Sequence, residues 1–189
     1  DRYISQIPFR DKIRDRLIGF MKIDEMSIPE KVLDGERILQ YKKNADDEKW
    51  ILYTQKDANS PLEVLIDPNK WAEDETLSFY RATRDGKLLC YGVSKGGNES
   101  PVLKVMEIES GKVLADEVKG WKQHINDWDI DGKGFYYSAC PLKGEVPEGE
   151  EYYWRSVYHH KLGTDKSEDV KCYFDTEVKE NWYSAYYSE

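Results

Sequence analysis

Three Asp-Gly pairs divide the 189-residue chain into units of similar length, and no other feature constrains its fold as strongly. The pairs are Asp34-Gly35, Asp85-Gly86 and Asp131-Gly132, so the steps between them are 51 and 46 residues. Short apolar and aromatic segments flank each pair, and Asp-Gly in that setting is a strong signal for a β-hairpin. The spacing therefore predicts a repeated unit of short antiparallel strands.

A repeat of about 40 to 50 residues with about four strands per unit is typical of the blades of a β-propeller. The strands predicted most clearly are residues 49–54, 62–66, 77–82, 88–93, 102–108 and 124–128. A propeller closes with roughly four to eight blades, whereas residues 34–189 hold two complete units and part of a third. We therefore predict a mainly β chain that forms the first two to three blades of an incomplete propeller. Residues 182–187 are interpreted as the strand that opens the next unit, so we expect a fragment of a longer polypeptide.

A helical pattern precedes the strands. Residues 9–23 place apolar side chains at helical spacing and basic side chains on the other faces, and Pro29 ends any continuation. We interpret residues 1–33 as a helical lead-in segment that packs on a neighbouring domain. A basic amphipathic helix can also bind a membrane or calmodulin, and that alternative stays open.

Composition and charge exclude several classes of protein. The chain has 14 Tyr, 6 Trp and 5 Phe, too many aromatic residues for a disordered segment. Its net charge of -9 disfavours nucleic acid and membrane surfaces as partners. Cys90, Cys140 and Cys172 are scattered and form no disulfide or zinc pattern, and we expect no cofactor. No apolar run is long enough for a transmembrane helix.

Two short motifs resemble functional sites but lack the context that each site needs. Gly92–Gly96 matches the G-x-S-x-G nucleophile elbow around Ser94, but a loop and a strand follow where the motif requires a helix. We interpret it as a hairpin loop, and we assign no catalytic triad in this chain. Asp127–Gly132 begins like a calcium-binding EF-hand loop, yet position twelve is Ser138 rather than the bidentate Glu. We expect a hairpin turn there and no metal.

His159 and His160 are the only adjacent histidines. Neighbouring residues of a strand point to opposite faces, so the two side chains cannot easily bind one metal ion. The pattern predicts one packed and one solvated imidazole.

Several segments together resemble the opening blades of prolyl oligopeptidases. They are Val64–Asn69, Thr83–Lys87, Tyr91–Ser94, Trp128–Tyr137 and Val157–Asp169. The last is similar to the family segment Y-x-H-x-L-G-T-x-x-S-E-D. Oligopeptidase B shares parts of this pattern, but the Ser-Glu-Asp ending favours the prolyl type. The resemblance covers nearly the whole chain in the right order.

The resemblance implies a two-domain serine peptidase in which a seven-bladed propeller caps an α/β-hydrolase domain. The chain would gate and wall the cavity where short peptides are cleaved, with the hydrolase domain and remaining blades as partners. The catalytic triad would lie in the hydrolase domain. One propeller position near the substrate, aromatic in some members, aligns with Gln123, which we predict to be a substrate-cavity wall residue. The alternative function is a non-catalytic propeller module that binds a protein or peptide. A cytoplasmic location is expected, and a periplasmic one stays open, as does the choice between prolyl and basic cleavage sites.

Overall fold

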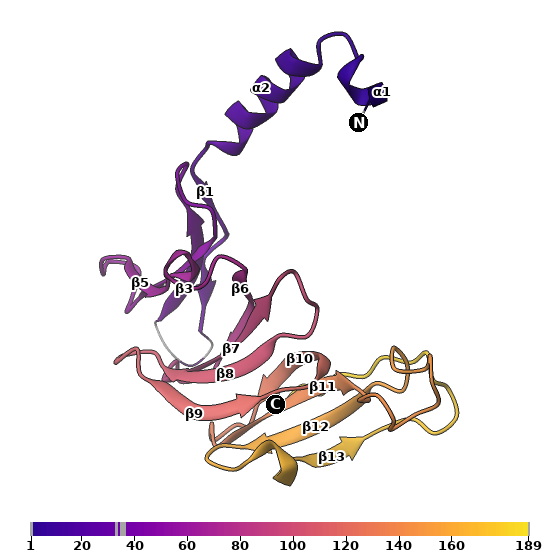
Figure 1. The fold of residues 1–189 in the computed structure, drawn as a ribbon. Coiled ribbons are helices and arrows are strands. Elements are labelled where there is room, and N and C mark those ends of the chain that lie inside the picture. The colour runs from indigo at the N-terminus through magenta and orange to yellow at the C-terminus, as the bar shows by residue number, and fades with distance from the viewer. Residues whose placement is uncertain (1, 33, 35–36, 189) are drawn as a thin grey trace.

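The computed structural model describes residues 2–32, 34 and 37–188, which form three antiparallel sheets in sequence order (Figure 1). The first sheet contains β1 (Glu25–Met26), β2 (Glu30–Lys31), β3 (Ile38–Lys43), β4 (Ile51–Gln55) and β5 (Glu63–Ile66). The second contains β6 (Glu75–Ala82), β7 (Leu88–Lys95), β8 (Val102–Glu107) and β9 (Val113–Val118). The third contains β10 (Trp121–Trp128), β11 (Gly134–Cys140), β12 (Ser156–Lys161) and β13 (Val170–Tyr173). Short 3-10 turns occur at η1 (Pro68–Lys70) and η2 (Lys166–Glu168).

Each sheet is a meander, and apart from β1 and β2 its strands pair with their neighbours in sequence. In the first sheet β1 and β2 share one partner, since both pair with β3. Residues 25–31 therefore already belong to a sheet, although we predicted the propeller to begin at residue 34. The division into a lead-in segment at 1–33 and blades at 34–189 stays a prediction.

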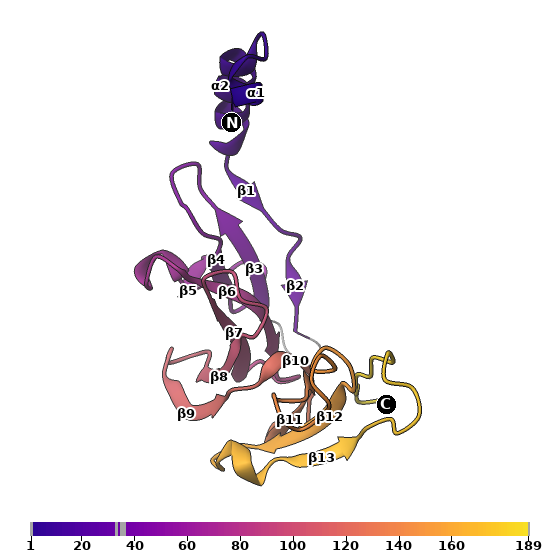
Figure 2. The same ribbon diagram turned by 45° about the vertical axis from the view of Figure 1, so that its right-hand side comes forward.

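The predicted helix is present as α2 (Arg10–Met21), preceded by the short α1 (Arg2–Ser5). Figures 1 and 2 show both helices standing away from the sheets, and α2 has no buried residue. Among the described residues, no helix is both long and apolar enough to span a membrane. The apolar side chains of α2 are thus uncovered in this chain, and their packing on another domain stays a prediction.

The second and third Asp-Gly pairs occupy equivalent hairpin turns. Thr83 N–H donates to the Leu88 carbonyl, and Asp129 N–H donates to that of Gly134, both at 2.9 Å. Within these turns Gly86 and Gly132 have φ of 68° and 67°, in the left-handed region that favours glycine. The side chains of Asp85 and Asp131 each accept the backbone N–H two residues ahead at 3.1 Å. The two predicted hairpins at these pairs are confirmed.

Val32 and Arg37 are hydrogen-bonded as are the residues on either side of the other two turns. Val32 N–H donates to the Arg37 carbonyl at 2.9 Å, and Asp34 follows Val32 by two residues, as Asp85 follows Thr83. The predicted Asp-Gly turn itself includes Gly35, which lies outside the described residues.

The second sheet lies between the other two and contributes to two cores. Leu89 and Tyr91 of β7 pack in a core with residues of the first sheet, such as Leu52. Cys90, between them in sequence, packs in a second core with Phe135 and other residues of the third sheet. Successive strand residues point to opposite faces, so the continuous apolar run at the start of β7 is explained by burial on both faces.

The C-terminal residues differ from the prediction. Residues 182–188 form no strand, although we predicted one at 182–187. They lie along β10 through isolated hydrogen bonds, in which Ala185 N–H donates to Asn126 at 3.3 Å and Tyr187 N–H donates to Asp127 at 3.2 Å. A strand needs a continuous backbone ladder, and here side chains of β10 accept the bonds instead.

A close contact between β6 and β7 provides a test of this packing. Phe79 lies over Gly92, its partner on the neighbouring strand, and a Cβ on Gly92 would sit 2.8 Å from the Phe79 ring. We expect Gly92→Ala to displace the ring and lower the free energy of unfolding by about 1 to 3 kcal/mol, measured by urea denaturation. Gly19→Ala, with open space around it in α2, is the matched control and should lose no stability. An unchanged urea midpoint for Gly92→Ala would contradict the packing described here.

Candidate functional site

An open hollow of about 380 Å³ lies where the first strands of the second and third sheets, β6 and β10, come together. Its lining includes Ser78, Phe79, Ser94, Gln123, His124 and Arg155. The Phe79 and His124 rings join the two strands, with centroids 4.3 Å apart. This hollow contains the cavity-wall residue predicted from the sequence and the serine of the G-x-S-x-G motif.

Gln123 borders the hollow but uses its amide group elsewhere. Its Nε2 donates to the Val118 carbonyl at 2.6 Å and also to the Pro101 carbonyl. Its Oε1 has no hydrogen-bond partner among the described residues, and it packs so closely on Gly120 that a Cβ there would collide with it. Gln123 therefore braces the connection between β9 and β10, and its contact with a substrate stays a prediction.

Ser94 lies near the end of β7, and the chain turns from there into β8, as the hairpin interpretation predicted. Its hydroxyl is 2.5 Å from that of Ser78 on β6. A serine nucleophile needs an adjacent general base. The group that Ser94 contacts is a second hydroxyl, so the arrangement pairs two strands rather than activating Ser94.

The three aspartates of the EF-hand-like segment form separate contacts. Asp129 faces His159, with Oδ2 and Nε2 2.9 Å apart. Asp131 pairs with Lys133 at 2.8 Å, and Asp127 accepts hydrogen bonds from Trp128 N–H and Tyr187 N–H. Among the described residues, no three His, Cys, Asp or Glu side chains gather as metal ligands would.

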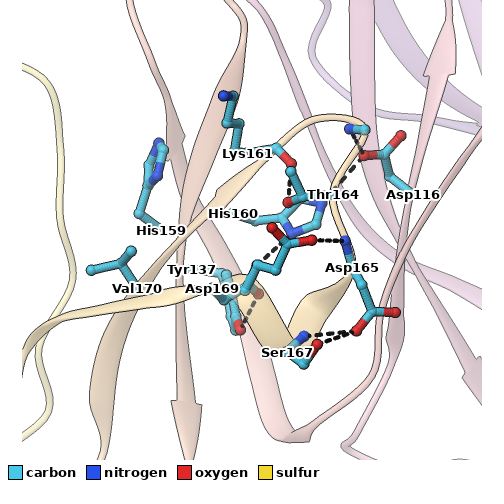
Figure 3. Close-up of polar contacts among 12 residues, drawn as sticks. Asp116, Tyr137, His159, His160, Lys161, Thr164, Asp165, Ser167, Asp169 and Val170 are labelled. Carbon is cyan, nitrogen blue, oxygen red and sulfur yellow. Dashed lines mark hydrogen bonds and ion pairs between the residues drawn. The ribbon is translucent and has the colours of Figure 1, made fainter.

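His159 and His160 point to opposite faces of β12, as predicted (Figure 3). His160 is fully buried, whereas His159 is partly exposed and contacts Asp129. The prediction of one solvated imidazole was therefore wrong in part, because a carboxylate from the start of the β10–β11 turn reaches His159.

His160 sits between two carboxylates that come from different sheets (Figure 3). Its Nδ1 is 2.6 Å from Asp169, just before β13, and its Nε2 is 3.3 Å from Asp116 on β9. Asp169 also accepts a hydrogen bond from the Tyr137 hydroxyl at 2.8 Å, and Asp116 accepts one from Gly163 N–H at 2.6 Å. This buried network links the second sheet to the third.

The electrostatics of the network favour a charged imidazole. Burial lowers the pKa of His160, but the hydrogen bonds and charges of Asp169 and Asp116 raise it more, so the net shift is upward. Burial and the Asp169 carboxylate raise the pKa of Tyr137 well above its usual range. The sequence analysis missed Asp116 and Tyr137, since Asp116 lies 44 residues from His160 and no motif marks either residue.

Comparisons with known proteins agree with this fold. A family model described as the N-terminal β-propeller domain of prolyl oligopeptidase matches residues 1–189. The prolyl endopeptidases of Elizabethkingia miricola and Elizabethkingia meningoseptica are each 30% identical to the chain over 191 residues. The matches cover 99% of this chain but 26% of each relative, so the chain spans about a quarter of their length.

Solved structures show the same architecture. A structure from a study of two prolyl endopeptidases matches with a TM-score of 0.82 and 27% identity, over 93% of this chain and 26% of that chain. Prolyl oligopeptidase B from Galerina marginata, bound to a 25mer macrocyclization substrate, matches with a TM-score of 0.77 and 23% identity, over 94% of this chain and 28% of that chain. At that identity the second match shows the fold alone. The predicted resemblance and the predicted β-propeller fold are confirmed.

The His160 network makes stability depend on pH in a defined direction. The folded pKa of His160 is raised, so the stabilisation is fully present below the ordinary histidine pKa of about 6.5 and is lost as pH rises through the folded pKa. We expect the free energy of unfolding to fall across that window, measured by urea denaturation at pH values from 6 upward. In His160→Gln this fall should disappear, and stability at pH 6 should drop by about 3 to 5 kcal/mol because two buried carboxylates lose their cation.

His159→Gln is the matched control on the same strand, and it should retain the alkaline loss of stability. If the His160→Gln protein shows the same pH profile as the unmodified protein, His160 is not the group that titrates.

Proposed function

Because this chain belongs to the family of N-terminal β-propeller domains of prolyl oligopeptidases, we propose that it walls and gates a cavity in which a serine peptidase cleaves short peptides. The triad would be supplied by a C-terminal hydrolase domain, which together with the remaining blades forms the partner of this chain. The observation that carries the proposal is the hollow between β6 and β10, in which the hydroxyl of the motif serine is hydrogen-bonded to a second serine hydroxyl.

The lining of the hollow suits a wall better than a reaction centre. Phe79 and His124 present a ring pair. Burial lowers the pKa of His124, a hydrogen bond at the Ile125 backbone opposes this, and the nearby Arg155 and Arg81 charges lower the pKa further. Aromatic and apolar surface with a small number of placed polar groups is typical of sites that hold peptide segments. Access is then limited by the shape of this face.

The test is to fill the hollow in the full-length protein that contains this chain. Ser78 is exposed at the hollow, and Ser78→Trp adds a large side chain there. We expect kcat/KM for a prolyl-linked chromogenic peptide to fall by about tenfold, the effect of losing about 1.4 kcal/mol of binding or positioning. Labelling by a small fluorophosphonate should be much less affected, since the serine nucleophile is unchanged.

Lys112→Trp, in the exposed turn before β9, is the control for a new surface tryptophan and should leave both readouts unchanged. Equal loss of peptide hydrolysis and fluorophosphonate labelling in Ser78→Trp would point to a folding defect instead of a blocked cavity. A full-length protein that binds peptides but hydrolyses none and takes no label would favour the non-catalytic propeller module.

A further inference from the structure

Arg155 is a buried positive charge in the lining of the hollow. The residue lies directly before β12 and is 8% exposed. Its guanidinium interacts with the Cys140 thiol and stacks on the Trp182 ring, 4.7 Å from the centroid. Among the described residues no Asp or Glu forms an ion pair with it. Burying a charge without a counter-ion costs free energy. A negatively charged group that paired with Arg155 would reduce this cost.

The other charged lining residues of the hollow cancel each other and leave Arg155 unbalanced. Lys122 and Glu99, which both line the hollow, form an ion pair with each other. Arg155 and Arg81 both lower the pKa of His124, after the larger effect of burial, so both positive charges act on the hollow. The chain as a whole has a net charge of -9, which makes a cationic hollow a local exception.

The guanidinium is held in place by its neighbours in the sequence. Trp154, the residue before it, donates its backbone N–H to the Lys179 carbonyl at 2.9 Å and its indole N–H to Glu150 at 2.8 Å. Lys179 in turn pairs with Glu150 at 2.6 Å. The loop that precedes Arg155 is thereby tied to the segment that precedes Trp182, and the cation and its stacking partner are fixed together.

We propose that Arg155, stacked on Trp182, binds a carboxylate of a peptide in the hollow. A planar guanidinium presents paired N–H donors that match the two oxygens of a carboxylate. The carboxylate supplies the missing counter-charge and comes from the peptide C-terminus or from an Asp or Glu side chain. The inference rests on the proposed function, since it takes the hollow to face peptide substrates.

The test uses the full-length protein and three prolyl peptides that differ only at one residue and at the C-terminal group. The first has a Glu and an amidated C-terminus, the second has Gln in its place with the same amidated end, and the third has Gln and a free C-terminal carboxylate. We expect at least one carboxylate peptide to have a KM about tenfold lower than the Gln amide, with similar kcat. The peptide that shows the effect identifies which carboxylate is bound.

Variants then assign the preference to Arg155. In Arg155→Met the KM ratio between the acidic and amide peptides should fall to about one, while Arg155→Lys should keep part of the preference because it retains the charge. The ratio is insensitive to the amount of folded protein. Arg16→Met, which removes an exposed arginine of α2, is the control and should keep the ratio.

Hydrolysis of all three peptides with equal KM values would overturn the carboxylate site and leave the proposed function intact. Failure to hydrolyse any of them would instead contradict the proposed function. A preference that persists in Arg155→Met would place the carboxylate site on another residue.

Discussion

The structure depends on two apolar interfaces that share one sheet. Alternate residues of β7 enter different cores, Leu89 and Tyr91 towards the first sheet and Cys90 towards the third. A sheet that is apolar on both faces must pack against another element on each face. The sheets are therefore stacked in sequence order, and polar contacts also join them. The Asp116–His160–Asp169 network and the hydrogen bond from the Trp128 indole to the Arg81 carbonyl both cross between the second and third sheets.

The sequence predicts local features, such as turns and the faces of single strands. It does not predict the contacts that form when the sheets stack. The hairpins at Asp85-Gly86 and Asp131-Gly132 follow from turn chemistry that four residues contain, and the opposite directions of His159 and His160 follow from the pleat of a single strand. In contrast, Asp116 meets His160 only because β9 and β12 belong to neighbouring sheets. The predicted strand at 182–187 failed for the same reason. Its residues have strand character, but the hydrogen bonds that they form depend on Asn126 and Asp127 of another element.

The candidate site shows a similar division. The resemblance to the family predicted Gln123 as a site residue, and in the structure this residue borders the hollow. Its amide, however, is hydrogen-bonded to the Val118 backbone carbonyl. The sequence did not predict Arg155 as a site residue, because an arginine next to a strand is common in a sequence with 28 Lys and Arg. That it forms no ion pair with a described Asp or Glu is visible only when the loops before β12 and before Trp182 are brought together. The surroundings of both residues are therefore set by contacts between sheets and loops rather than by a continuous motif.

The meander topology also bears on how the protein is made. Each sheet is complete once its own strands have left the ribosome, since none waits for a distant segment to pair with. At translation rates of about 5 to 20 residues per second, units of about 50 residues follow one another at intervals of roughly 2 to 10 seconds. During each interval the newest sheet presents one uncovered apolar face. A nascent chain of this kind thus exposes apolar surface during several short intervals. Chaperones would bind during each interval, as the next sheet leaves the ribosome.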